Sequence, residues 1–309
     1  MATTTATGKA KKAAPHTLNG KANGSAVTKN RLEVRKTYKI YIDGKFPRTE
    51  SGRVYALKNA AGEVIANICR GSRKDLRDSV VSNRKAQEAW AKRSAYNRGQ
   101  ILYRIAETLE GRRAQFADTL TKQGYTATAA QKEIDASIDL LVYYAGWSDK
   151  YTQVFSSVNP VESSHFNFSY HEPMGIVTII AEQNSGLLGI VASAIPVITG
   201  GNTCTVMVSE KYPMTAIDFA EVLHASDVPG GVINLITGYR KEFTGHASSH
   251  MDVNAIVYND LSAEDRKLVQ TNAALNVKRV IDFSKEPLLN PYRILAAQEV
   301  KTTWHPIGS

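Results

Sequence analysis

Cysteine thiols are the strongest nucleophiles that this 309-residue chain could offer, and it contains two, Cys69 and Cys204. A reactive thiolate needs a partly exposed, electropositive setting. Both cysteines fall within predicted strands, which favours two small buried side chains over a nucleophile. Two cysteines form neither a disulfide framework nor a cysteine-rich zinc site, and they fit a reducing compartment.

Histidine provides one pair with metal-ligand spacing. Of the seven histidines, His246 and His250 lie four residues apart on a predicted helix, which places both on one face. A zinc site needs three or four ligands, and Asp252 is the nearest candidate for a third. We therefore predict no metal site.

Basic residues gather at the start of one predicted helix. They are Arg70, Arg73, Lys74 and Arg77. Asp75 and Asp78 are interleaved with them, a pattern typical of a solvated helix face. The chain has no Gly-x-Gly-x-x-Gly phosphate loop. From the sequence we expect a solvated surface here.

The second half of the chain alternates short apolar strands with segments of helical length. The predicted strands are 176–181, 203–208, 232–236, 254–258 and 277–283. The predicted helices are 187–198, 213–225, 240–249 and 262–275. This alternation predicts an α/β fold, a Rossmann-like open parallel sheet with flanking helices. Ligands of such sheets bind at the carboxyl ends of the strands. Here those ends are residues 181–186, 207–211, 237–240 and 259–263.

The first half predicts a few strands and then three helices. Residues 38–43 and 54–69 alternate in polarity, which indicates a small antiparallel appendage. Ser72, with Asp75 three residues later, resembles a capping box at the start of a helix. The three helices are predicted over 72–90, 97–123 and 128–150.

Two further segments have the pattern of exposed strands. Residues 151–171 predict a protruding hairpin, whose second arm alternates Phe166, Phe168 and Tyr170 with polar residues. Residues 300–304, near the C-terminus, are also strand-like. Exposed strands that carry aromatic side chains predict pairing with another chain.

Seven short motifs follow one another along the chain. They are Tyr-Ile-Asp-Gly-Lys at 41–45, Ser-Ala-Tyr-Asn-Arg-Gly at 94–99, Tyr-Tyr-Ala-Gly-Trp-Ser-Asp-Lys at 143–150, His-Glu-Pro-Met-Gly at 171–175, Gly-Asn-Thr at 201–203, Pro-Met-Thr-Ala at 213–216 and Pro-Gly-Gly-Val-Ile-Asn at 229–234. In this order they resemble the aldehyde dehydrogenase superfamily, from about residue 38 onward. The resemblance implies a cofactor-type α/β domain with an oligomerisation hairpin.

The family resemblance also implies a chemistry. Family members oxidise aldehydes through a cysteine thiolate that passes hydride to NAD(P), which requires an activated thiolate, an oxyanion donor and a general base. The nucleophile belongs to a catalytic domain that follows the cofactor domain. In this chain residues 284–292 lead almost directly into 300–305, which resembles the family's final strand. We therefore expect that the catalytic domain is deleted.

Several positions that the family uses for its cofactor and oxyanion are altered. Asn184 matches the oxyanion asparagine, and Glu210 matches the ribose-binding glutamate, whose lysine partner aligns with Met207. Asp260 replaces a glycine beneath the pyrophosphate, where its charge would oppose an anion. Asp282 falls within one position of the general-base glutamate. These changes predict no cofactor, with NAD binding weak or absent.

Most of the formal net charge of +9 falls in one segment. Residues 1–36 hold eight lysines and arginines against Glu33 alone, which leaves 30 basic against 28 acidic residues over 37–309. The segment is rich in Ala, Thr, Gly, Ser and Asn, so it is predicted to be disordered. A solubilising tail is the favoured interpretation, and a nucleic-acid-binding arm is the alternative.

The predicted organisation has five segments. They are a disordered basic arm at 1–36, N-terminal strands and helices of the cofactor-type domain at 37–150, an oligomerisation hairpin at 151–172, the α/β cofactor-type sheet at 173–285, and a connector with a C-terminal oligomerisation strand at 286–309. No apolar run approaches the ~20 residues that cross a bilayer. We therefore expect a cytoplasmic protein without a membrane partner.

Together these observations predict a catalytically silent aldehyde-dehydrogenase-like subunit with a structural or regulatory role. Its expected partners are copies of itself, in a homo-oligomer, or a full-length aldehyde dehydrogenase, in a hetero-oligomer. The alternative is an NAD(P)-dependent aldehyde oxidoreductase whose nucleophile is supplied in trans.

Overall fold

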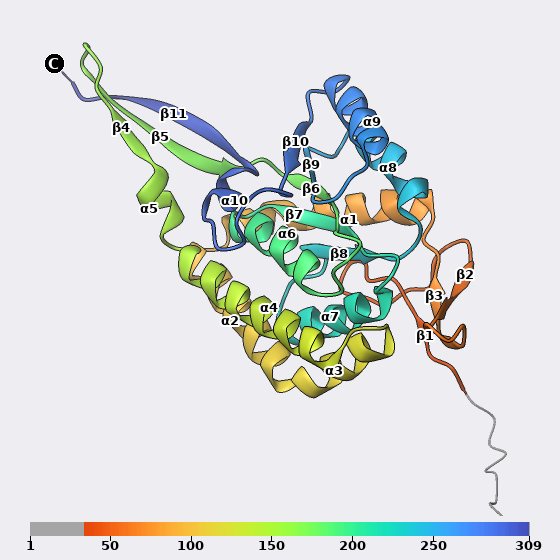
Figure 1. The fold of residues 1–309 in the computed structure, drawn as a ribbon. Coiled ribbons are helices and arrows are strands. Elements are labelled where there is room, and N and C mark those ends of the chain that lie inside the picture. Colours follow the sequence, from red (N-terminus) through yellow and green to blue (C-terminus); the bar gives the residue numbers. More distant parts are fainter. Residues whose placement is uncertain (1–33, 309) are drawn as a thin grey trace, which may run out of the picture. The chain divides into compact units, whose positions relative to one another are not determined.

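The centre of the structure is a parallel sheet of five strands (Figure 1), seen in a computed structural model that describes residues 34–308. The strands are β6 (Ile176–Ile180), β7 (Thr203–Met207), β8 (Ile233–Ile236), β9 (Ala255–Tyr258) and β10 (Arg279–Asp282). Their order in the sheet is β10-β9-β6-β7-β8. This arrangement confirms the predicted α/β fold with an open parallel sheet. The predicted arm at 1–36 lies almost wholly outside the described residues.

Helices cover both faces of the sheet. They are α1 (Arg73–Lys92), α2 (Ala95–Gly111), α3 (Arg113–Lys122), α4 (Ala127–Trp147), α6 (Leu188–Thr199), α7 (Pro213–Ala225), α8 (Arg240–Ser249) and α9 (Ala263–Ala274). Alternate strand residues point to opposite faces. Val177 and Ile179 therefore pack in the cluster that includes α4 and α6, whereas Ile176 and Ile180 pack with α8 and α9. No helix within residues 34–308 is both long and apolar enough to cross a membrane.

The helix boundaries agree with the sequence at most ends and differ at one. Ser72 caps α1 through the predicted capping box with Asp75. The single helix predicted over 97–123 is instead two helices, α2 and α3. The break follows Gly111, where the backbone N–H of Arg112 bonds back to the Leu109 carbonyl at 3.0 Å. A glycine at a helix end weakens continuation, which is why periodicity alone missed the break.

The N-terminal strands form a separate three-stranded sheet. They are β1 (Thr37–Tyr38), β2 (Val54–Lys58) and β3 (Val64–Cys69), in the order β1-β3-β2. β2 and β3 are antiparallel, but β1 runs parallel to β3, so the prediction of a wholly antiparallel appendage is wrong. β1 is also short, because Tyr41 leaves this sheet and exchanges backbone hydrogen bonds with Leu235 of β8.

The third sheet joins residues that are far apart in the sequence. Its strands are β4 (Ser157–Asn159), β5 (His165–Pro173) and β11 (Gln298–Pro306), in the order β11-β5-β4. β11 pairs antiparallel with β5 over nine residues, from Gln298 opposite Pro173 to Pro306 opposite His165. Figure 1 shows these strands extending beyond the helices that cover the central sheet.

The first arm of the predicted hairpin is shorter than expected. Residues 151–155 form a short helix, α5 (Tyr151–Phe155), instead of strand. The Phe155 ring stacks on Trp147 and lies 5.0 Å from the Tyr292 ring, which belongs to helix α10 (Tyr292–Leu295). This aromatic packing holds the segment against the body, so that pairing with β5 begins only at Ser157.

Candidate functional site

A cavity of about 470 Å³ lies where the central strands end. Its walls come from the segments that follow β6, β9 and β10, and from α4 and α6. The side chains important here are Glu133, Glu182, Asn184, Asn259 and Arg293. The cavity therefore lies at the carboxyl edge of the sheet, where ligands of open α/β sheets bind.

The amino terminus of α6 faces this cavity and is capped by a side chain from another helix. The Oε1 atom of Glu133, on α4, accepts hydrogen bonds from three successive backbone N–H groups, those of Gly186, Leu187 and Leu188, at 2.7–3.0 Å. The Ser185 hydroxyl donates to the same oxygen at 2.8 Å. A Cβ at Gly186 would lie 2.7 Å from Leu120 Cδ2 and 3.1 Å from Tyr212 Cβ, so a larger residue there would displace these side chains. Glu133 thus acts as an anion bound at a helix amino terminus.

Glu182 is the side chain in the cavity best suited to move a proton. Partial burial, followed by the nearby Asp260 and Glu133 carboxylates, raises its pKa above the ordinary value for glutamate. A carboxyl group with a raised pKa in a cleft is a candidate general acid or base. Asn184, the predicted oxyanion residue, lines the same cavity. Its Oδ1 accepts from Lys211 Nζ at 2.6 Å.

An arginine ties the strand ends together beside this cavity. Arg240, the first residue of α8, donates through Nη2 to Asp260 Oδ1 at 2.6 Å and to the Ala181 carbonyl at 2.5 Å. The other oxygen of Asp260 accepts from the Gln183 backbone N–H at 2.7 Å. Glu210, the predicted ribose-binding residue, accepts from the Arg240 backbone N–H at 2.6 Å. The sheet edge therefore brings both carboxylates to Arg240, Asp260 at its guanidinium and Glu210 at its backbone N–H.

Two buried donors at this edge have no acceptor among the described residues. They are Arg240 Nε and Gln183 Nε2. Buried donors normally find partners, because leaving one unpaired costs about 1–3 kcal/mol. A phosphate-containing ligand at this edge offers oxygen acceptors of the kind that these donors lack. The residues present therefore fit a phosphate-containing ligand, with Glu210 available to a hydroxyl group.

The remaining predicted positions lie away from the cavity. Cys69, in β3, and Cys204, in β7, are both buried, and burial raises the pKa of the Cys204 thiol far above its ordinary value. Met207 packs in an apolar cluster with Ile180 and Ile236. Asp282 is exposed at the end of β10 and accepts from the Ser284 backbone N–H at 2.9 Å. It is not among the residues that line the cavity with Asn184.

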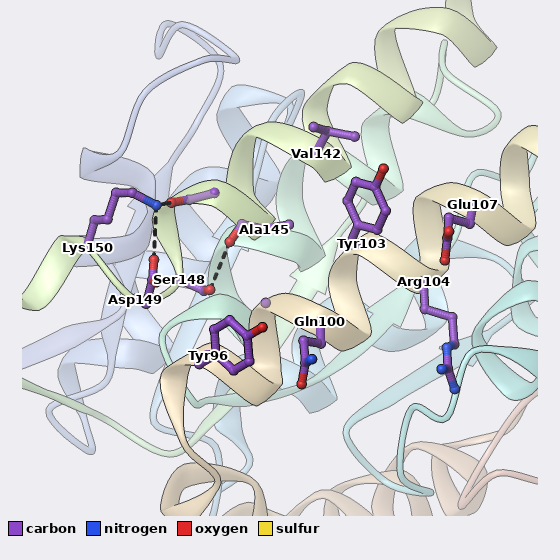
Figure 2. A pocket seen from close by; sticks show the side chains of 12 residues that line it. Tyr96, Gln100, Tyr103, Arg104, Glu107, Val142, Ala145, Ser148, Asp149 and Lys150 are labelled. Carbon is purple, nitrogen blue, oxygen red and sulfur yellow. Dashed lines mark hydrogen bonds and ion pairs between the residues drawn. The ribbon is translucent and has the colours of Figure 1, made fainter.

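A second hollow, of about 500 Å³, lies between α2 and α4 (Figure 2). The exposed rings of Tyr96 and Tyr103 form part of its wall. Its polar groups are engaged locally, since the Ser148 hydroxyl donates to the Ala145 carbonyl and Lys150 Nζ lies 3.1 Å from Asp149 Oδ1. These groups do not converge on a common point, so we place the candidate site at the sheet edge.

The sequence predicted the sheet edge as the location of the site, but it did not predict three residues at or beside the cavity. Glu133, Arg240 and Arg293 lie on elements that precede or follow the motif positions. Arg240 could have been identified from its position, because it lies within 237–240, one of the predicted strand ends where ligands bind. Nothing in the sequence marks Glu133, whose role depends on how α4 crosses α6. The predicted roles of Asn184 and Glu210 stay predictions.

The chain is similar to proteins of one known family. The sequence profile described as "Aldehyde dehydrogenase family" matches residues 46–281. Retinal dehydrogenase 2 of Gallus gallus is 31% identical over 256 residues, which cover 81% of this chain and 48% of that protein. The chain thus spans about half the length of the curated relatives it matches.

Solved structures share the fold. Betaine aldehyde dehydrogenase of Staphylococcus aureus, in complex with NAD+, has a TM-score of 0.75 at 26% identity, over 79% of this chain and 49% of that one. The NAD+ complex of an aldehyde dehydrogenase of Bacillus cereus has a TM-score of 0.76 at 24% identity, over 80% of this chain and 50% of that one.

The expectation that this chain takes no cofactor, with NAD binding weak or absent, is corrected by these comparisons. Structures of the matched family hold NAD+ on the fold that this chain shares. The physical reason for the error is visible at Asp260. Its charge was expected to repel a phosphate, but Arg240 pairs with it at 2.6 Å and offsets that charge. The prediction considered the charge of Asp260 alone and did not include the compensating charge of Arg240.

Proposed function

This chain belongs to the aldehyde dehydrogenase family, and from that premise we propose that it is a nicotinamide-nucleotide-binding subunit that does not supply a thiolate nucleophile of its own. Its role is structural or regulatory within an oligomer of its own copies or with a full-length aldehyde dehydrogenase. The observation that carries the proposal is the burial of both thiols in strands, away from the cavity at the sheet edge. The alternative activity is aldehyde oxidation with the nucleophile supplied in trans.

The proposed cofactor site is the carboxyl edge of the central sheet. NAD(P), when bound, would supply hydride-transfer chemistry. Arg240 and Gln183 offer the unpaired donors described above to its phosphates, and the Glu210 carboxylate can accept from a ribose hydroxyl. Glu182, with its raised pKa, can hold or release a proton at the edge of the cavity.

The proposed assembly surface is the β11-β5-β4 sheet. β11 is an edge strand, paired on one side only within the described residues. Val300 and Trp304 on this strand are 63% and 58% exposed. An edge strand with exposed apolar side chains is a template for another chain. On the opposite face of the sheet, Phe166, Phe168 and Tyr170 form a continuous row of rings, with centroids 5.6 and 6.0 Å apart.

NAD+ is expected to bind the purified chain, and Arg240→Gln is expected to weaken binding at least tenfold, about 1.4 kcal/mol. The substitution removes the charge and the Nε donor while leaving Asp260 uncompensated. Isothermal titration calorimetry with NAD+ and with NADP+ measures the effect. Arg266→Gln, which removes an exposed arginine from α9, is the control and should titrate like the unmodified chain.

Two results would contradict the proposed function. One is that the unmodified chain gives no heat of binding with either nucleotide at millimolar concentration. Arg240→Lys, which keeps the positive charge, is titrated beside Arg240→Gln to separate the loss of charge from a change in fold. The other is aldehyde-dependent NADH formation by the chain alone. If NADH forms only when the chain is mixed with a full-length aldehyde dehydrogenase that keeps its nucleophile but has lost its own NAD+ binding, the in-trans alternative is supported instead.

The chain is expected to be oligomeric, and the double variant Val300→Lys with Trp304→Lys should shift it to monomers. Two ammonium groups on the exposed strand oppose close pairing of a second chain. Multi-angle light scattering after gel filtration gives the mass. Met251→Lys with Leu275→Lys is the matched control, since both side chains are exposed apolar groups elsewhere. A chain that is monomeric without substitution, and that copurifies with no aldehyde dehydrogenase, would refute the assembly role.

A further inference from the structure

A third cavity, of about 450 Å³, lies between the first turns of α1 and the last turn of α8. We call it the basic pocket. Its polar lining consists of Arg73, Lys74 and Arg77 from α1, with His246, Ser249 and His250 at the end of α8. From the sequence, the basic residues of α1 were interpreted as a solvated helix face, and His246 and His250 as an incomplete metal pair. The fold brings them together around one space.

The residues that line the basic pocket carry a net positive charge. No aspartate or glutamate is among its lining residues. Lys74 and Arg77 each reach one exposed carboxylate outside the pocket, Glu50 at 3.4 Å and Asp78 at 3.2 Å. Such exposed pairs contribute little and exchange readily. Arg73 has no acidic partner among the described residues.

The positive charges around the pocket also affect His250, on the α8 side. His250 Nδ1 accepts from the Asp252 backbone N–H at 3.2 Å, which leaves its Nε2 atom for another partner. Burial, and then the Lys278 and Arg73 charges, lower the pKa of His250, against an opposing effect of the Asp252 carboxylate. That carboxylate is itself held by Arg84 at 2.7 Å. The pocket is therefore a cationic space whose own residues repel further positive charge.

We propose that the basic pocket binds the phosphate group of a small molecule. Two guanidinium groups and one ammonium group provide several donors with full charge. Guanidinium forks match the oxygens of phosphate, and a multiply charged anion uses several cations at once. A volume of about 450 Å³ admits a small organic phosphate.

This site is distinct from the proposed cofactor site and does not depend on it. Arg240 opens α8 at the sheet edge, whereas Ser249 closes the same helix. At 1.5 Å per residue the two ends are about 13 Å apart. A ligand in the basic pocket should therefore leave nucleotide binding at the sheet edge unchanged.

Inorganic pyrophosphate is the probe for the basic pocket. We expect calorimetry on the full chain at low ionic strength to show one site, and Arg73→Gln with Arg77→Gln to weaken it at least tenfold. The matched control is Lys85→Gln with Lys92→Gln, which removes the same charge from α1. Lys85 lies twelve residues, or about 18 Å, from Arg73 along the helix. The control should bind pyrophosphate like the unmodified chain.

Several outcomes would overturn the proposal. One is the absence of pyrophosphate binding, and another is equal weakening in both double variants, which would indicate diffuse surface charge. Displacement of pyrophosphate by saturating NAD+ would place it at the sheet edge instead. A single-stranded oligonucleotide that binds through Arg73 and Arg77 when pyrophosphate does not would indicate a nucleic-acid surface. Thermal unfolding of each variant confirms that it is folded.

Discussion

Glu133→Ala is expected to lower the free energy of unfolding by about 3 kcal/mol. One oxygen of this side chain satisfies the backbone N–H groups of three residues, 186–188, and the Ser185 hydroxyl. Alanine removes this acceptor from the Leu187 and Leu188 N–H groups and the Ser185 hydroxyl, whereas the Gly186 N–H still reaches the Tyr125 hydroxyl at 3.1 Å. It also removes the negative charge that the helix dipole favours there. Urea denaturation followed by circular dichroism measures the change.

Two further variants define what Glu133 contributes. Glu133→Gln keeps an acceptor and loses the charge, so its expected loss is about 1 kcal/mol. Asp139→Ala removes an exposed carboxylate from the same helix and should leave stability within ±0.5 kcal/mol. Equal stability of Glu133→Ala and the unmodified chain would show that water replaces the carboxylate without loss.

The contrast between Glu133 and the strands shows what could be predicted from sequence. Strands such as 176–180 are short apolar runs between turn signals, so local composition located them within two residues. The helices 213–225 and 240–249 were likewise located from their position between strands. These features depend on residues that are near one another in the chain.

Features that depend on distant pairing were not predictable in the same way. The bridge of Tyr41 to Leu235 shortens β1, and the packing of Phe155 on Tyr292 turns a predicted strand into helix. At the candidate site, Arg240 and Asp260 are twenty residues apart. Asp260 alone suggested that a phosphate would be repelled, and Arg240 was not singled out. Charge compensation is a property of the folded pair, so the separate residues could not indicate it.

The buried Arg293 is the second position where a single change should have a large effect, and Arg293→Met is expected to cost about 3 kcal/mol. The residue is 2% exposed. Its guanidinium donates to the carbonyls of Ala192, Phe283 and Glu286, at 2.6–3.2 Å, and thereby joins α6 to the chain that follows β10. Methionine keeps the length of the side chain but leaves these carbonyls without their donor.

Two effects of Arg293→Met oppose each other. Removing a buried guanidinium relieves its desolvation, an effect that lowers the pKa of Arg293 in the folded chain. The lower desolvation cost is gained for one side chain, whereas three hydrogen bonds to carbonyl groups are lost. Each of these charge-assisted hydrogen bonds contributes about 1 kcal/mol or more to the free energy of unfolding. We therefore expect net destabilisation, measured by urea denaturation.

The controls for Arg293 test whether its geometry or its charge matters. Arg293→Lys restores the charge at a single nitrogen, which cannot span three carbonyls, so it should recover less than half of the lost stability. Arg266→Met, at an exposed arginine on α9, should be near neutral. If Arg293→Met is as stable as the unmodified chain, then desolvation dominates, and the wall of the cavity does not depend on this side chain.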